Sequence, residues 1–568
     1  MRNSTIRAAE KSGLALSLTI VALAGICVSV LKAGDGAKQA VPRQTATISG
    51  TVTADKSDVK AVRIKAKDTV RKIAYTVFTN KGGYHIFNLP AGSYEVSAVQ
   101  DGFESTIQHV ELTPGQTQTA DLALTAKAPA RQVELVDYDV LYPPGPGRDL
   151  LMRECGGCHG LLHIPWHRMA HRNEDGWRTA VNRMFEINRA QVPVVSPEAV
   201  SAAERESIIK YFAANFGEDS KPRDLKLDPL PLNEADLSQA IYVQYALPPP
   251  VIGANGQTRS RGMHDIFPSR VSSTVWFGDT GTGSILGLDL RNIEYPSRFR
   301  EWPIPSAMDR SVVPHGIIED HGQVYWAELA GTAIGQLDPA TGTINRYLSP
   351  SKGSLHTLRA DSKGNIWYTS VYGASKIGRL DAKTKTMKEW DPSPNYKNAH
   401  YYGLIVDKKD RVWAAGNTAH TIVGYDPQSD KWTTYPTPTP SAGPRRPTAD
   451  SKGRIWFSEH LGDAIGMLDP KTGDITEYKS PFRHGGEYEC YADAEDNIWL
   501  TLRSYDTLLK FDPTTKKYTY FPYPEIKASV PKIETDAQGT IWFADGRNLV
   551  SFKPKGNVLP QQTSMNLR

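Results

Sequence analysis

One tryptophan-centred repeat dominates the C-terminal half of this 568-residue chain. Its tryptophans recur at intervals of 50, 41, 46, 43, 43 and 43 residues, at Trp276, Trp326, Trp367, Trp413, Trp456, Trp499 and Trp542. Around most of them lies an Asp/Gly turn, then Val or Ile before the Trp, and then the pattern Ile-Gly-x-Leu-Asp. A period in the forties with four short strands is typical of a β-propeller blade. Because one blade cannot bury both of its faces, we predict a seven-bladed ring over residues 238–556.

The ends of this region predict how the ring closes. Residues 240–248 (AIYVQYALP) are similar to the outer strand of a blade and precede the first repeat, whereas the last repeat fades after Phe552. We therefore expect this early strand to complete the seventh blade.

Polar residues cluster at one predicted rim of the channel. The first strand of each blade should begin about 11 residues before its Trp, and the second should end about three after it. The two strands form a hairpin, so these ends share a rim, where propellers usually place their sites. The starts are His315, His356, Tyr402, Arg445, Tyr488 and Lys532, with His264 and Asp265 near the start in blade one. The ends are Asp279, Glu328, Ser370, Gly416, Glu459 with His460, Leu502 and Asp545. This composition favours a metal or acid–base site; the alternative is a solvated rim of unrelated loop residues.

Upstream of the repeat, a pentapeptide carries a specific chemical signature. Cys155-Gly-Gly-Cys158-His159 matches the attachment motif of a c-type haem. Each thiol can bond to one vinyl group of the porphyrin, and His159 can ligate the iron. A redox Cys-x-x-Cys or half of a zinc site is the alternative, but a zinc site needs a second ligand pair, and only Cys27 and Cys490 are left. We therefore predict covalently attached haem c.

The residues around this motif predict a small helical domain over 140–218. Helices are expected at 147–154, 175–185 and 197–216 from their periodicity and end signals. A short helical region around one haem resembles the cytochrome c fold, which implies a second axial iron ligand, most often Met. Met184 is the first choice, with the alternatives Met169, His163, His167 and His171. Met184 could equally be a core residue, because Met often fills cores.

The N-terminal part contains an apolar segment and a β-rich region. Basic residues precede an apolar run over 13–31, which is typical of an export signal. At 19 residues the run could also span a bilayer, so 1–32 is a signal peptide or an uncleaved membrane anchor. Lipidation of Cys27 is disfavoured, since bulky Ile26 stands where a small residue is expected. We expect a periplasmic or extracytoplasmic protein, free or anchored to the inner membrane.

Residues 46–125 alternate between apolar and polar residues in short runs separated by glycine turns, which predicts an antiparallel β-sandwich. The stretches GYHIF (83–87) and LPAGSYEV (89–96) resemble carboxypeptidase regulatory-like domains, which implies a binding or spacer module with a carbohydrate-binding-like fold. Linkers are expected at 33–45, 126–139 and 219–237, and a tail at 557–568. The predicted fold is therefore multidomain and mainly β, with one small α-helical domain.

The propeller repeat itself resembles the virginiamycin B lyase (streptogramin lyase) family. The matching stretches are Pro314-His315-Gly316-Ile317 with Glu328, and Trp456-Phe457-Ser458-Glu459. The resemblance implies that His315 is a base, that Glu328 is a Mg²⁺ ligand and that His356 contacts substrate, with Glu459 as a further possible Mg²⁺ ligand. Val313 stands where the family has its second metal-binding Glu.

Three functions remain in competition. A c-type cytochrome would exchange electrons with a redox partner protein or act as a haem-dependent oxidoreductase component. A lyase would open a cyclic ester or depsipeptide by elimination, and a binding protein would hold a carbohydrate or peptide beside a haem relay. Nucleic acid is not expected, because 66 Lys and Arg nearly balance 62 Asp and Glu. The haem motif favours the first function.

Overall fold

The computed structural model describes residues 45–55, 59–127, 133–156, 171–186, 200–252, 256–305, 312–396, 399–526, 528 and 530–558. These residues belong to one compact unit, Gln44–Arg568. The predicted leader, the attachment residues Cys158 and His159, and the alternative ligands Met169, His163 and His167 lie outside the described residues. Within the described ranges, no helix combines the length and apolar character that a bilayer crossing would need.

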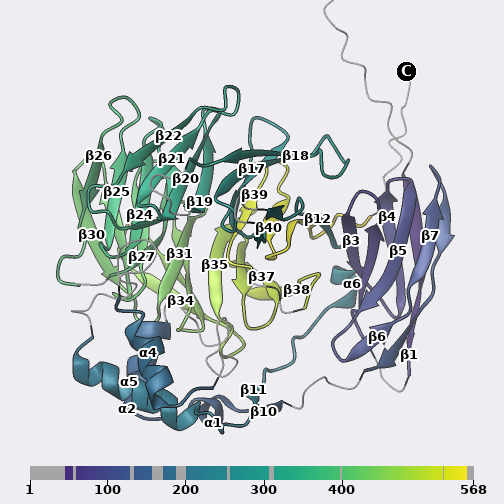
Figure 1. Ribbon diagram of the computed structural model, residues 1–568, viewed down its shortest axis with the longest axis horizontal. Coiled ribbons are helices and arrows are strands. Elements are labelled where there is room, and N and C mark those ends of the chain that lie inside the picture. The colour runs from purple at the N-terminus through teal and green to yellow at the C-terminus, as the bar shows by residue number, and fades with distance from the viewer. Residues whose placement is uncertain are drawn as a thin grey trace, which may run out of the picture. The chain divides into compact units, whose positions relative to one another are not determined.

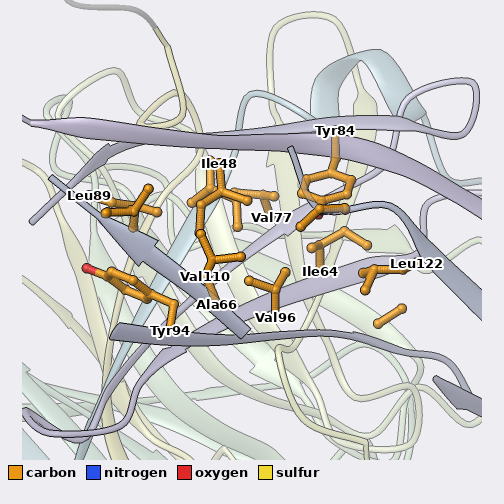
Figure 2. Close-up of a cluster of buried hydrophobic side chains, with 14 of the residues drawn as sticks. Ile48, Ile64, Ala66, Val77, Tyr84, Leu89, Tyr94, Val96, Val110 and Leu122 are labelled. Atoms are coloured by element: carbon orange, nitrogen blue, oxygen red, sulfur yellow. Dashed lines mark hydrogen bonds between the residues drawn. The ribbon is translucent and has the colours of Figure 1, made fainter. Parts of the chain in front are cut away.

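The N-terminal region forms two sheets around an apolar core. Its strands are β1 (Ala46–Ala54), β2 (Arg63–Asp68), β3 (Ile73–Phe78), β4 (Gly83–Leu89), β5 (Gly92–Val99), β6 (Phe103–Ser105), β7 (Gln108–Leu112), β8 (Thr117–Thr119) and β9 (Leu122–Ala126). One sheet has the order β4-β1-β9-β6 with β8 beside β1, and the other contains β3-β2-β5-β7. Alternate residues such as Ile48, Ile64 and Val96 point inward and are fully buried, as Figure 2 shows.

A small helical region follows the sandwich. Its elements are β10 (Glu134–Val136), α1 (Tyr138–Leu141), α2 (Pro146–Leu151), the π-helix η1 (Met152–Gly156), α4 (Glu174–Asn182), α5 (Ala202–Asn215) and β11 (Arg223–Leu225). Trp177 of α4 stacks on Phe212 of α5, with ring centroids 4.5 Å apart. The sequence predicted the last helix to begin at 197. It begins at Ala202, because Ser201 and Glu204 form a reciprocal capping box there.

Helix α6 (Glu234–Leu237) and a two-stranded pair, β13 (Val251–Ile252) and β14 (Thr258–Arg259), precede the repeat. The repeat itself is built from four-stranded antiparallel sheets (Figure 1). Six of them follow one another along the chain. They are β15 (Met263–Pro268), β16 (Thr274–Asp279), β17 (Ser284–Asp289) and β18 (Phe299–Pro303); β19 (Val313–Asp320), β20 (Gln323–Ala330), β21 (Ala333–Leu337) and β22 (Ile344–Leu348); β23 (Ser354–Ala360), β24 (Ile366–Tyr372), β25 (Lys376–Leu380) and β26 (Met387–Trp390); β27 (Tyr401–Val406), β28 (Val412–Gly416), β29 (Thr421–Asp426) and β30 (Lys431–Pro436); β31 (Pro444–Ala449), β32 (Ile455–Glu459), β33 (Ala464–Leu468) and β34 (Ile475–Lys479); β35 (Glu487–Ala492), β36 (Ile498–Leu502), β37 (Thr507–Asp512) and β38 (Lys517–Pro522).

The seventh sheet closes the ring in the predicted way. It consists of β39 (Ile533–Thr535), β40 (Ile541–Ala544), β41 (Asn548–Lys553) and the early strand β12 (Ile241–Ala246), and Tyr242 pairs with Phe552. The inner strand of each sheet contacts that of the next, and β39 contacts β15. The free edge of β12 pairs with β3, so this sheet continues into the sandwich as eight strands.

A hydrogen bond between Asp and Trp repeats in five blades. The carboxylate of an Asp six residues before the Trp accepts from the indole Nε1 at 2.8–3.0 Å, at Asp361, Asp407, Asp450, Asp493 and Asp536. In the fifth blade, Asp450 Oδ1 also accepts from the backbone N–H groups of Lys452 and Arg454. The Asp/Gly turn of the repeat therefore fixes the hairpin between the first and second strands.

We predict that Asp450→Ala lowers the free energy of unfolding by roughly 2–4 kcal/mol, because it leaves a buried indole N–H and two turn N–H groups without acceptors. Chemical denaturation monitored by Trp fluorescence measures this. Asp474→Ala is the matched control, since Asp474 is exposed in the same blade and should change stability by less than about 0.5 kcal/mol. Equal effects of the two substitutions would contradict the assigned role.

Candidate functional site

The inner strands share one irregularity, which creates the site. In β15, β19, β23, β27, β31 and β35 the pairing register shifts near the start of the strand. Such a β-bulge places two residues opposite one and re-aims side chains. In the fifth blade it spans Arg445 and Arg446, and both guanidinium groups lie over the rings of Tyr402 and Tyr488. Two successive residues of an inner strand can therefore face the channel.

The predicted strand starts come together in the structure. The ring centroids of His264 and His315 are 3.9 Å apart, and those of His315 and His356 are 4.1 Å apart. His356 lies 4.1 Å from the ring of Tyr402, whose hydroxyl is hydrogen-bonded to that of Tyr488. All of these side chains are buried except His264, which is 26% exposed. Residues from five different blades thus form one largely buried cluster instead of a solvated rim.

A network of ion pairs lies next to this cluster. Arg446 lies 3.7 Å from Asp265 and 3.5 Å from Glu489. Lys532 lies 3.2 Å from both Asp265 and Glu534, and Glu534 also pairs with Arg359 at 2.8 Å. Arg446, Glu489 and Glu534 were not predicted from the sequence. One signal for the second bulge position was available in another blade, where Gly316 follows His315. A Cβ at Gly316 would lie 2.2 Å from the His356 carbonyl oxygen, so this position packs closely on the next inner strand.

The cluster keeps its imidazoles neutral and its carboxylate ionised. Burial lowers the pKa of His264, and it lowers the pKa values of His315 and His356 further, with the neighbouring imidazoles and Arg446 acting in the same direction. Burial alone would raise the pKa of Asp265, but Lys532 and Arg446 outweigh it and hold that pKa well below its usual value. Neutral imidazoles can accept protons or bind metal ions.

One group of described side chains has the spacing of a metal site. The ligand atoms of His264, Asp265 and His315 all lie within 4.8 Å of one another. Asp265 Oδ1 is already 2.7 Å from His264 Nδ1. The two cations beside Asp265 oppose the binding of a further cation there.

The two predicted Mg²⁺ ligands, Glu328 and Glu459, do not belong to this group. Glu328 is fully buried, and both of its oxygens accept from Arg346, at 2.7 and 2.5 Å. A Mg²⁺ ion at Glu328 would have to displace that arginine, so the described residues do not fit a Mg²⁺ site there. Glu459 ends β32 opposite Pro444, in the same register as Glu328 opposite Pro314, as the sequence predicted.

Glu459 lies near a second buried carboxyl, Glu487. Burial raises the pKa of Glu459 to about 8, with Glu477 adding to the effect. Burial likewise raises the pKa of Glu487 to about 8, and the charges of Asp463 and Glu459 contribute. Within the described residues, the side-chain oxygens of both have no hydrogen-bond donor. These carboxyls are therefore protonated at neutral pH.

The haem-motif residues that the structure describes lie at the end of the helical core. Cys155 is in η1, and both Cys155 and Met184 are half-buried against the cluster that contains Trp177 and Phe212. Met184 was expected on a helix, but α4 ends at Asn182, and the Met184 N–H donates to the Val181 carbonyl in a turn. His171, an alternative ligand, is half-buried before α4.

This end of the helical core contacts the propeller. A carbon placed on Gly156 would lie 3.5 Å from Leu461 Cδ2, in the loop after β32. Tyr138 of α1 stacks on His484, in the loop before β35, with centroids 4.1 Å apart. Leu461 follows His460, whose ring meets that of Tyr488 at 5.7 Å. The Cys155 end of η1 therefore borders the part of the channel built by blades five and six.

The ends of the inner strands surround a separate cavity of about 450 Å³. Its lining includes Arg359, Glu489 and Glu534 from the ion-pair network, together with Cys490. Burial raises the pKa of the Cys490 thiol well above its ordinary value, which disfavours the thiolate form.

Comparisons with known proteins agree with this architecture. Residues 397–558 match the model of the virginiamycin B lyase family, and residues 47–125 match that of the carboxypeptidase regulatory-like domain. This chain carries a virginiamycin B lyase-like propeller domain. The sandwich is a carboxypeptidase regulatory-like domain. No curated protein matches the chain.

Several solved structures are similar to the propeller domain. A streptogramin B lyase is 23% identical, with a TM-score of 0.48, over 55% of this chain and 97% of that one. Virginiamycin B lyase from Staphylococcus aureus is 23% identical, with a TM-score of 0.46, over 51% of this chain and 94% of its own. YCF48 from Cyanidioschyzon merolae is 14% identical, with a TM-score of 0.44, over 55% of this chain and 99% of that one.

The buried carboxyl of Glu487 predicts a pH dependence of stability. The folded state keeps the proton up to about pH 8, whereas the unfolded carboxyl loses it near its ordinary pKa of 4.5, so stability falls as pH rises between these values. Because Glu459 has the same raised pKa and keeps its share of the fall, we expect Glu487→Gln to reduce the fall by about half and to gain roughly 3 kcal/mol over wild type at pH 8. Thermal melts between about pH 5 and 8 measure it, with exposed Glu495→Gln as the control. A wild-type slope that survives in Glu487→Gln would contradict the assignment.

Proposed function

We propose that this chain is an exported c-type cytochrome that acts in electron transfer or as a haem-dependent oxidoreductase component outside the cytoplasm. The pentapeptide Cys155–His159 carries the proposal, because its two thiols and adjacent imidazole are what covalent haem attachment requires. A haem bound there would supply one-electron redox chemistry. A redox partner protein would supply or remove the electrons.

The described residues of the helical region fit this group. Cys155 lies in η1 and is half-buried against the core, so its side chain is held at the edge of an apolar cluster. Met184 packs against the same cluster from another segment, as an axial ligand from a second segment would have to do. The surrounding Trp177, Ile208 and Phe212 are buried and exclude water, which is one of the factors that set a haem potential.

The contact between η1 and the propeller supports a joint role for the two domains. Gly156 borders Leu461, and His460 next to it reaches Tyr488 in the channel cluster. We therefore expect that a ligand bound in the channel would change the haem potential. The location is proposed to be periplasmic, with the segment over 1–32 as signal or anchor.

The test of this proposal is a spectrum. The full chain, expressed with its leader in a host that attaches c-type haem, should give a reduced-minus-oxidised c-type band and retain haem on a denaturing gel. Cys155→Ala with Cys158→Ala should lose the covalent haem. Cys490→Ala is the control, since Cys490 lies in the propeller and should leave the haem unchanged. A wild-type protein without covalent haem would contradict the proposal.

The axial ligand is tested with the same protein. If Met184 ligates the iron, Met184→Ala removes the near-infrared absorption of a methionine-ligated ferric haem and lowers the reduction potential. If the band persists in Met184→Ala, Met184 is a core residue and Met169 becomes the candidate ligand; a wild type without the band would favour a histidine such as His171.

A second candidate is elimination chemistry at His315. Its Nδ1 is buried without a hydrogen-bond partner among the described residues, and burial keeps the imidazole neutral, as a base must be. Since Arg346 occupies Glu328, the base would act without a metal ion on that carboxylate. If this function holds, wild type opens a cyclic depsipeptide and His315→Ala loses at least about a hundredfold in rate. Full turnover by His315→Ala, or none by wild type, would exclude it.

A further inference from the structure

The guanidinium group of Arg445 has an unusual environment. The side chain is fully buried on β31, and its three nitrogens have no hydrogen-bond acceptor in the part of the chain that the structure describes. The guanidinium lies over the faces of Tyr402 and Tyr488, whose ring centroids are 4.7 and 4.2 Å from the guanidinium carbon. A guanidinium carries five N–H donors and does not lose its charge in proteins. The aromatic faces stabilise part of that charge, but they do not provide hydrogen-bond acceptors for the N–H groups.

The nearby carboxylates are committed to other cations. Asp265 lies between Arg446 and Lys532, and Glu489 lies beside Arg446. Glu534 pairs with Lys532 and Arg359. Four cationic side chains of this network, Arg359, Arg445, Arg446 and Lys532, therefore face three carboxylates, while the three imidazoles are neutral. The centre of the channel has an excess of positive charge.

This excess decides which class of ligand the channel can take. A cation bound by His264, Asp265 and His315 would lie beside Lys532 and Arg446 and would be repelled by both. An anion would gain from the same charges and would satisfy the N–H groups of Arg445. The electrostatics of the channel therefore favour an anion over a metal ion.

We propose that Arg445 anchors a binding site for an oxyanion inside the propeller channel, either the carboxylate of a small organic acid or an inorganic oxyanion. The planar fork of a guanidinium matches two oxygens of such a group in a bidentate arrangement. His315 Nδ1, also buried without a partner among the described residues, belongs to the same channel cluster through His356 and Tyr402. Solvent reaches the cluster beside His264, whose side chain is 26% exposed. The site does not depend on the haem.

The test is a titration of the full chain, followed by calorimetry and by thermal melting. Acetate, oxalate, phosphate and sulfate are added at constant ionic strength set with sodium chloride. We expect saturable binding of at least one oxyanion and a rise of its melting temperature with ligand concentration. The carboxylate and inorganic arms decide between the two sources. Binding should weaken at least about tenfold in Arg445→Met, which loses both the charge and the fork.

Two further variants make the result specific. Arg454→Gln is the matched control, because Arg454 is in the same blade but pairs with Asp450 at 2.6 Å, so it should bind like wild type. If Arg445→Met does not fold, Arg445→Lys keeps the charge and loses the fork, and it must bind more weakly than wild type. Wild-type protein that binds none of the four anions, or an Arg445 variant that binds as tightly as wild type, overturns the proposal.

Discussion

Strand β12 is hydrogen-bonded along both edges, and the arrangement of the sandwich and the propeller depends on it. Tyr242 pairs with Phe552 of β41 on one side and with Thr76 of β3 on the other. The ring of Tyr242 also stacks on that of Phe552, with centroids 4.4 Å apart. Without β12, the seventh blade would expose β41 and the sandwich would expose β3, and exposed strand edges invite pairing with other chains. One strand thus closes the ring and covers both edges.

The junction is reinforced by a buried arginine. Arg298 follows the first blade's third strand and donates to the backbone carbonyls of Arg71 at 2.7 Å and Lys72 at 3.2 Å, at the turn before β3. Burial lowers the pKa of Arg298, with the nearby tyrosines acting in the opposite direction. Here a buried guanidinium finds backbone acceptors, as buried charges in folded proteins normally do. Arg445 has no such acceptor among the residues that the structure describes, and this contrast supports its role as a ligand-binding group.

The repeat made much of the propeller predictable, but the ion-pair network in the channel could not be predicted from it. An offset from each Trp, counted from Tyr325 in the second blade, located the strand ends, and Pro314 faces Glu328 as Pro444 faces Glu459. The offset says nothing of bulges, which bring Arg446 into the channel beside Arg445. Nor does it show that Arg346, on the outer strand of its blade, reaches Glu328, because such a contact depends on side-chain length and direction. The β3–β12 pairing was also hidden, since period-2 patterns do not identify which edges meet.

The two proposals meet at one place in the molecule. From Gly156 at the end of η1, contacts run through Leu461 and His460 to Tyr488, which touches Arg445. Burial acts to raise the pKa of Tyr488, but Arg445, Arg503 and Arg446 lower it overall. An oxyanion on Arg445 would offset part of that positive field and so raise the pKa of Tyr488. A haem on Cys155 would sense the same change, because a positive field raises a reduction potential and its neutralisation lowers it. Occupancy of the channel and electron transfer would then be linked through charge alone, without movement of either domain.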